Sequence, residues 1–190
     1  MLGQPPDLVP DDLTADEYLE LGIWYQESKK FAQARESLQR TIREASESNA
    51  AQRARRLLAE SIPTKESDPD VIERFNDINM VALTSPGRAK KQYESLIEEH
   101  PDFEWPYRAI AEGLCRRVGD VEQAKALLEK ALTINPNYVG ALVTMIETQL
   151  ADMQYAEARK YLDRLTEIAA DNPDARNLRR TLEILVAADR

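Results

Sequence analysis

The stretch GDVEQAKALLEKALTINP, residues 119–136, decides the fold of this 190-residue chain. Its small and large apolar residues recur at intervals of three and four, which places them on one face of an α-helix: Ala124, Leu128 and Ala131. Asp120 offers a cap for the start of this helix, with Gln123 three residues further on. The stretch therefore predicts a helix over 121–134 with one packed face.

The same spacing returns on both sides of this stretch. The alanines Ala89, Ala124 and Ala158 lie 35 and 34 residues apart. Near the N-terminus, Tyr18-x2-Leu21-Gly22-x2-Tyr25 leads into Phe31-x2-Ala34-x3-Leu38. The pattern resembles the tetratricopeptide repeat, a helix–turn–helix unit of about 34 residues whose small residues lie where two helices touch. The resemblance covers 15–46 and 69–170 and implies a superhelix of such units.

Proline, aspartate and asparagine residues divide the chain into short helical segments joined by loops of two to five residues. We expect helices over 15–28, 31–46, 50–61, 69–83, 86–100, 104–118, 121–134, 138–152, 155–170 and 173–188. Thr14 with Glu17, and Asn49 with Gln52, have the spacing of capping boxes. Short loops make successive helices antiparallel neighbours. The predicted fold class is all-α, an α-α superhelix like the right-handed tetratricopeptide solenoid.

The repeat is interrupted once, which suggests two helical parts. Ala34 and Ala89 are 55 residues apart, more than one repeat length. We expect a flexible segment over 1–13, a hairpin with a half-repeat helix over 14–62, a polar linker over 63–69, and three repeats over 70–190. The last part ends in a capping helix whose outer face carries Arg176, Arg179 and Arg180.

Charge and composition exclude several classes of function. The net charge of −9 and a pI near 4.8 disfavour nucleic acid, because phosphate binding needs clustered Lys and Arg. The longest charge-free stretch, 131–146, contains Asn135-Pro136-Asn137, so no membrane span is expected. The opening residues lack the basic and apolar regions of a secretory signal, and one cysteine allows no internal disulfide. A cytoplasmic location is the expectation.

The sequence offers little for catalysis. His100 is the only histidine and Cys115 the only cysteine, so no His/Cys zinc site can form, and neither phosphate-binding glycine motif is present. We interpret His100 as the end of a helix before Pro101, and Cys115 as a small buried residue between hairpins. No enzymatic activity, cofactor or metal is expected.

The resemblance implies a protein–protein interaction module whose first helices line a concave face. The residues expected to bind a partner there are Arg74, Ile78, Val81, Ala109, Gly113, Arg116, Val143, Glu147 and Leu150. This wall is largely apolar, which suits a peptide or an amphipathic helix of another protein, in an adaptor, scaffold or chaperone-like role. It lacks the Lys and Asn residues with which part of the family grips a C-terminal carboxylate. The alternative is a self-associating subunit, a homodimer that buries the groove.

Overall fold

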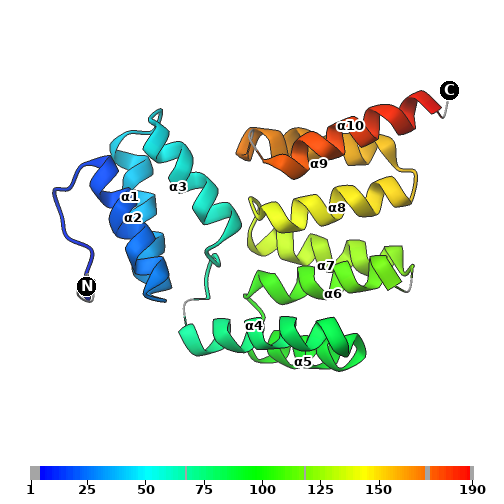
Figure 1. Cartoon of the computed structure of the whole chain (residues 1–190), viewed down its shortest axis with the longest axis horizontal. Coiled ribbons are helices and arrows are strands. Elements are labelled where there is room, and N and C mark those ends of the chain that lie inside the picture. The colour runs from blue at the N-terminus through cyan, green and yellow to red at the C-terminus, as the bar shows by residue number, and fades with distance from the viewer. Residues whose placement is uncertain (1–4, 67, 118, 170–171, 189–190) are drawn as a thin grey trace. The chain divides into compact units, whose positions relative to one another are not determined.

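The computed structural model describes residues 5–66, 68–117, 119–169 and 172–188, with backbone only for 114–117. This described part is helical, without β-strands, which confirms the all-α fold class (Figure 1). The ten helices are α1 (Ala15–Glu27), α2 (Phe31–Glu44), α3 (Asn49–Glu60), α4 (Pro69–Thr84), α5 (Pro86–Glu99), α6 (Glu104–Arg117), α7 (Val121–Ile134), α8 (Val139–Ala151), α9 (Tyr155–Ile168) and α10 (Pro173–Ala188).

The helix ends follow the capping residues, with one correction. Thr14 and Glu17 form the expected capping box, in which the Glu17 carboxylate accepts from the Thr14 backbone N–H. The predicted cap Asn49 is wrong: Ser48 caps α3, and its hydroxyl accepts from the backbone N–H of Ala51 at 3.0 Å. The error is one residue, because Ser and Asn are equally good caps and stand next to each other here. His100 is the C-cap of α5, as predicted.

The hairpins whose turns lie wholly within the described residues show two kinds of turn. Lys29 after α1 and Met153 after α8 adopt a left-handed conformation, with φ of 58° and 56°. In both turns the next backbone N–H reaches back five residues, from Lys30 to Tyr25 and from Gln154 to Gln149, which is the Schellman arrangement. The turn between α4 and α5 is shorter. Only Ser85 separates these helices, and Pro86 starts the second one.

The chain divides into two compact units, Met1–Asn76 and Asp77–Arg190, with the division inside α4. The boundaries expected from the sequence, with a linker over 63–69, stay predictions. In the first unit α3 packs on α1 and α2. The linker residues Pro63 and Glu66 are held there by Arg35, whose guanidinium donates to both of their carbonyl oxygens.

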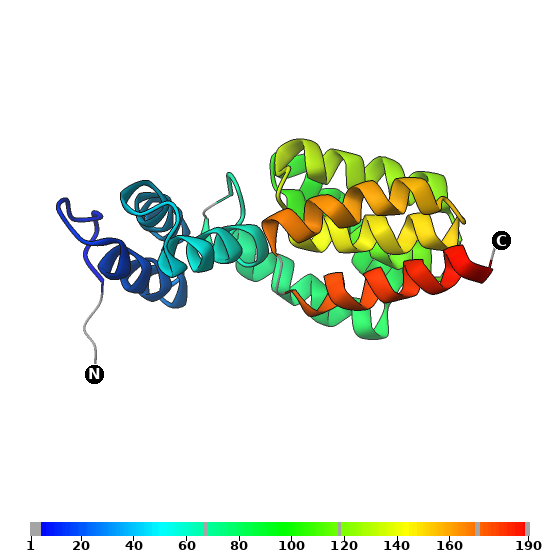
Figure 2. The ribbon, with the colours of Figure 1, turned by 90° about the horizontal axis from the view of Figure 1, so that it is seen from above.

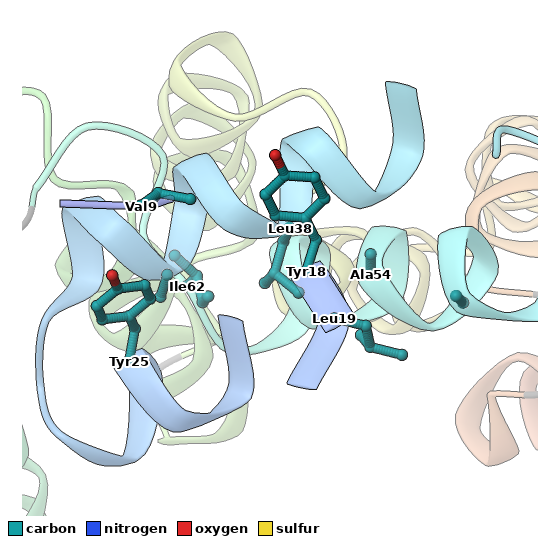
Figure 3. Close-up of a cluster of buried hydrophobic side chains, with 9 residues drawn as sticks. Val9, Tyr18, Leu19, Tyr25, Leu38, Ala54 and Ile62 are labelled. Atoms are coloured by element: carbon teal, nitrogen blue, oxygen red, sulfur yellow. The ribbon is translucent and has the colours of Figure 1, made fainter. Parts of the chain in front are cut away.

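The first unit encloses one apolar core (Figure 3). Helices α1, α2 and α3 supply most of it, and Val9 of the N-terminal segment and Ile62, just after α3, complete it. Its fully buried aromatic residue is Tyr25. Gly22 sets the approach of α1 to α2, because a Cβ atom there would lie 2.8 Å from the Leu38 side chain.

The second unit is a stack of hairpins. Helix α6 packs on α7, α8 on α9, and α7 on α8. Helix α10 packs against both α8 and α9, and Figure 2 shows the three side by side. Its inner face buries Ala175, Leu178 and Leu182. The arginines of its outer face are exposed, as a terminal helix requires: Arg176, Arg179 and Arg180.

Candidate functional site

The second unit contains a cavity of about 470 Å³ where α4, α5 and α6 meet. Helix α4 lines it with Asn79, Ala82 and Leu83, α5 with Ala89, Lys90 and Tyr93, and α6 with Arg108, Ala109, Ile110, Glu112 and Gly113. Pro86 and Gly87, at the start of α5, complete the wall. Most of these side chains are small or apolar. The cavity is therefore shaped to receive apolar groups beside a few polar ones.

A tyrosine forms the inner wall of this cavity. The buried Tyr93 on α5 donates its hydroxyl to the Asn79 side-chain oxygen on α4. Burial raises the pKa of the Tyr93 hydroxyl to about 12, so the hydroxyl stays protonated and remains a donor at neutral pH. This polar contact holds α4 and α5 together where the first hairpin uses close apolar packing.

Charged groups at the cavity are engaged with their own neighbours. The Arg108 guanidinium lies 2.8 Å from the Glu112 carboxylate and donates to the Thr144 hydroxyl of α8 at 3.3 Å. Lys90 lies 3.8 Å from Glu94 on the same helix. These pairs place charge of both signs among the residues that line the cavity.

Helix α4 exposes two large apolar side chains next to the cavity. Met80 is 66% exposed and Leu83, which also lines the cavity, is 74% exposed. Exposed apolar residues that continue into an apolar hollow are a feature of protein-binding surfaces. We call Met80, Leu83 and the cavity beside them the α4 surface.

The structure brings two of the predicted partner-binding residues to this cavity, Ala109 and Gly113. Ile78 is a correction: it is only 3% exposed and belongs to the buried face of α4, so it offers a partner no surface. Val81 is half-buried on the same helix, and Arg74 is exposed in the first unit.

The remaining predicted residues lie elsewhere or outside the described side chains. Val143 and Leu150 are half-buried on α8, and Glu147 is exposed there. The side chains of Arg116 and Cys115 lie outside the described residues, so their roles stay predictions. The sequence suggests that Ala124 faces either Gly113 or Ala111, and Gly113 has no atom within 4 Å of an added Cβ, which excludes the first. The other partner suggested for Ala124 was Ala111, and both alanines are fully buried.

Sequence reasoning missed the α4 residues of the cavity. The predicted wall took Arg74, Ile78 and Val81 from α4, whereas α4 buries Ile78 and lines the cavity with other residues: Asn79, Ala82 and Leu83. The missing signal was the turn, because the single residue between α4 and α5 replaces the three-residue turn of the first hairpin. The pair Ser85-Pro86 indicates this short turn in the sequence, because proline after a capping residue marks the start of a helix.

The described part of the chain contains no cluster of three or more His, Cys, Asp and Glu side chains suited to a metal ion. None of its helices has the length and apolar character needed to span a bilayer.

The α4 surface offers apolar contact area with charged side chains beside it. Such a surface can bind an apolar side chain of another molecule, and the charges can orient it.

Family models agree with the repeat pattern. Two of them, each described as "Tetratricopeptide repeat", match residues 116–182 and 18–48, together just over half of the chain. Comparison with curated proteins found no match.

Solved structures of similar fold belong to proteins of this kind. The complex of the yeast Sti1 TPR2B domain with pHsp70 has a TM-score of 0.55 at 24% identity, covering 63% of this chain and 98% of that one. The P58(IPK) TPR domain has a TM-score of 0.55 at 12% identity, with 93% and 47% covered. PilF of Pseudomonas aeruginosa has a TM-score of 0.53 at 17% identity, with 91% and 84% covered. At these identities the likeness shows the fold alone.

Proposed function

Because this chain belongs to the tetratricopeptide repeat family, we propose that it is a non-catalytic protein-interaction module that captures a peptide or amphipathic helix of another protein. The fold itself hosts many roles, so the proposal rests on a site rather than on the family. The complex of the similar yeast Sti1 domain with pHsp70 supports a protein as the class of partner.

The observation that carries the proposal is the α4 surface. It combines a cavity of about 470 Å³ with two exposed apolar side chains of α4, Leu83, which lines the cavity, and Met80, three residues before it. A large apolar side chain of a partner would fill the cavity while Leu83 packs along its backbone, the geometry of an anchor residue in a groove. Lys90, Arg108 and Glu112 would set orientation and association rate more than affinity.

The proposal is tested by selecting peptides from a display library on the wild-type chain and measuring their binding by calorimetry. We expect peptides with a large apolar anchor. Leu83→Asp places a charge at the cavity mouth and Ala109→Trp fills the cavity, and each should weaken such peptides by at least about 2 kcal/mol, the scale of a hot-spot residue. Ile184→Asp on α10 is the matched control, because Ile184 is also a largely exposed apolar residue but lies away from the cavity.

Equal binding to the wild type and to all three folded variants would show that the α4 surface is not the site. The competing function is a self-associating subunit whose groove is filled by a second copy. Light scattering over a concentration series distinguishes the two: a dimer that Leu83→Asp dissociates and Ile184→Asp does not would replace the adaptor role with self-association.

A further inference from the structure

The N-terminal segment lies on the first hairpin as a peptide lies in a binding site. Residues 5–13 form neither helix nor strand. Their main-chain carbonyls are bound by side chains of α1, of α2 and of the turn between them. Lys30 donates to Pro5 O at 3.1 Å, Gln33 to Asp7 O at 3.0 Å, and Tyr25 to Leu8 O at 3.0 Å.

The same hairpin binds the far end of the segment. The Tyr18 hydroxyl and the Arg40 guanidinium both donate to Pro10 O, at 3.2 and 3.0 Å. Arg40 also lies over the Tyr18 ring, with 5.7 Å to the ring centre. We call Tyr18, Tyr25, Lys30, Gln33 and Arg40 the carbonyl-binding face.

Two carboxylates of the segment meet two cations of this face. Asp7 accepts from Lys30 at 2.9 Å and Asp11 accepts from Arg40 at 2.6 Å. The two pairs are four residues apart along the segment, one on each side of Val9. The face is therefore complementary in charge to an acidic peptide.

Few apolar contacts hold the segment. Pro5 and Val9 are buried, Val9 to 7% exposure, whereas Leu8 is 82% exposed. The carboxylates of Asp7 and Asp11 remain almost fully exposed, and exposed ion pairs contribute little free energy. The covalent tether adds a high effective concentration to these contacts.

From these contacts we propose that the carbonyl-binding face is a second protein-binding site, with residues 5–11 as its built-in occupant. It takes an acidic, non-helical segment of another protein, with two carboxylates flanking an apolar anchor. Recognition of main-chain carbonyls tolerates many sequences, and Lys30 and Arg40 supply the selectivity. A partner with an anchor larger than Val9 displaces the tethered segment.

A second copy of this chain is a weaker occupant. Its segment would make the same contacts without the tether, and a short tether is equivalent to millimolar peptide. Only a partner whose own contacts exceed those of residues 5–11 overcomes that advantage. The built-in segment thereby sets an affinity threshold for partners.

The test uses the full chain with Val9→Asp, which removes the buried anchor of the tethered segment and opens the face. A peptide of residues 5–13, PPDLVPDDL, carries a fluorophore at its C-terminus and is titrated by anisotropy. We expect saturable binding to Val9→Asp, at least about tenfold tighter than to the wild type, whose face is occupied. If Val9→Asp lowers the helical circular dichroism signal, the milder Val9→Ala replaces it.

Matched variants in the Val9→Asp background locate the binding. Tyr25→Phe and Lys30→Met each remove a donor and should weaken the peptide severalfold. Arg43→Met removes an exposed cation of α2 outside the face and should leave binding unchanged. A peptide with both aspartates at positions 7 and 11 changed to asparagine should bind about two- to fivefold more weakly at low salt.

Absence of binding to folded Val9→Asp, or binding that Tyr25→Phe and Lys30→Met leave unchanged, would overturn the site. If the wild type is a dimer and Val9→Asp makes it monomeric, the occupant of the carbonyl-binding face is a second copy of this chain and not another protein. None of these variants touches the cavity of the second unit, so failure here is distinguishable from failure of the proposed function.

Discussion

The first hairpin, α1 and α2, and the second, α4 and α5, share a sequence pattern but pack differently. In the first, Gly22 stands twelve residues before Ala34 and lets Leu38 approach the α1 backbone. In the second, the residue twelve before Ala89 is Asp77, and it is exposed. Equal spacing along the chain therefore does not bring the same helix face inward.

The turn accounts for this difference. Three residues connect α1 to α2, and Lys29 among them takes the left-handed conformation. One residue connects α4 to α5. Helix α4 is also longer than α1, so its last buried residue, Ile78, lies eleven residues before Ala89, whereas Tyr25 lies nine before Ala34. Because each residue turns a helix by about 100°, this difference of two residues changes which face is buried. The first hairpin closes over a buried core, and the second leaves a cavity beside α6.

The largest expected change in the free energy of unfolding comes from replacing a glycine that close packing requires, compared with one that has open space around it. Gly22→Ala should destabilise the first unit by about 1–3 kcal/mol, because its Cβ would overlap the buried Leu38. Gly113→Ala, with open space around it on α6, should stabilise the second unit by up to about 1 kcal/mol through helix propensity.

Urea unfolding followed by tryptophan fluorescence measures both, because Trp24 lies in the first unit and Trp105 in the second. Trp105→Phe and Trp24→Phe provide backgrounds with one reporter each. A Gly22→Ala variant that leaves the first unit as stable as the wild type would show that the tight packing attributed to Gly22 is wrong.

Glycine substitutions at the two turns should change the free energy of unfolding by smaller amounts and with opposite signs. Lys29→Gly should stabilise the first unit by about 1 kcal/mol, because glycine adopts a positive φ without the Cβ clash. The ion pair of Lys29 with Glu73 is well exposed, so its loss subtracts little. Thr84→Gly, at the corresponding position but at the last residue of helix α4, should destabilise by no more than about 0.5 kcal/mol. Thermal unfolding of both variants checks the signs, and a stabilising Thr84→Gly would contradict the difference between the turns.

The smallest effect concerns the segment that covers only the first hairpin. The hydrogen bond from Lys30, and then its charge, lower the pKa of Asp7 from 3.8. A lowered folded-state pKa means that this contact stabilises docking above about pH 4 and is lost as the pH falls through the lowered value. NMR signals of the Val9 methyl groups should therefore move toward those of the free peptide in acid. Asp7→Asn should remove this part of the change, and an identical profile would show that Asp7 does not contribute.

The local features of this fold could be predicted from the sequence. Helix ends depend on caps, prolines and periodicity within a few residues, so the ten helices lie within two residues of the expected bounds. The capping box at Thr14 and the buried alanines Ala34, Ala124 and Ala158 follow from the same short-range rules.

Only the tertiary structure decided how these helices face one another and what covers them. The apolar spacing of Val71, Phe75 and Ile78 is consistent with one buried face of α4, but which neighbours cover that face is decided by the tertiary structure. The cavity draws residues from three helices, so its residues share no motif. Residues 5–11 show no helical or strand periodicity. The Leu8 carbonyl oxygen accepts a hydrogen bond from the Tyr25 hydroxyl, 17 positions further along the chain. Local rules act along the chain, whereas both candidate sites arise from groups that folding brings together from distant positions.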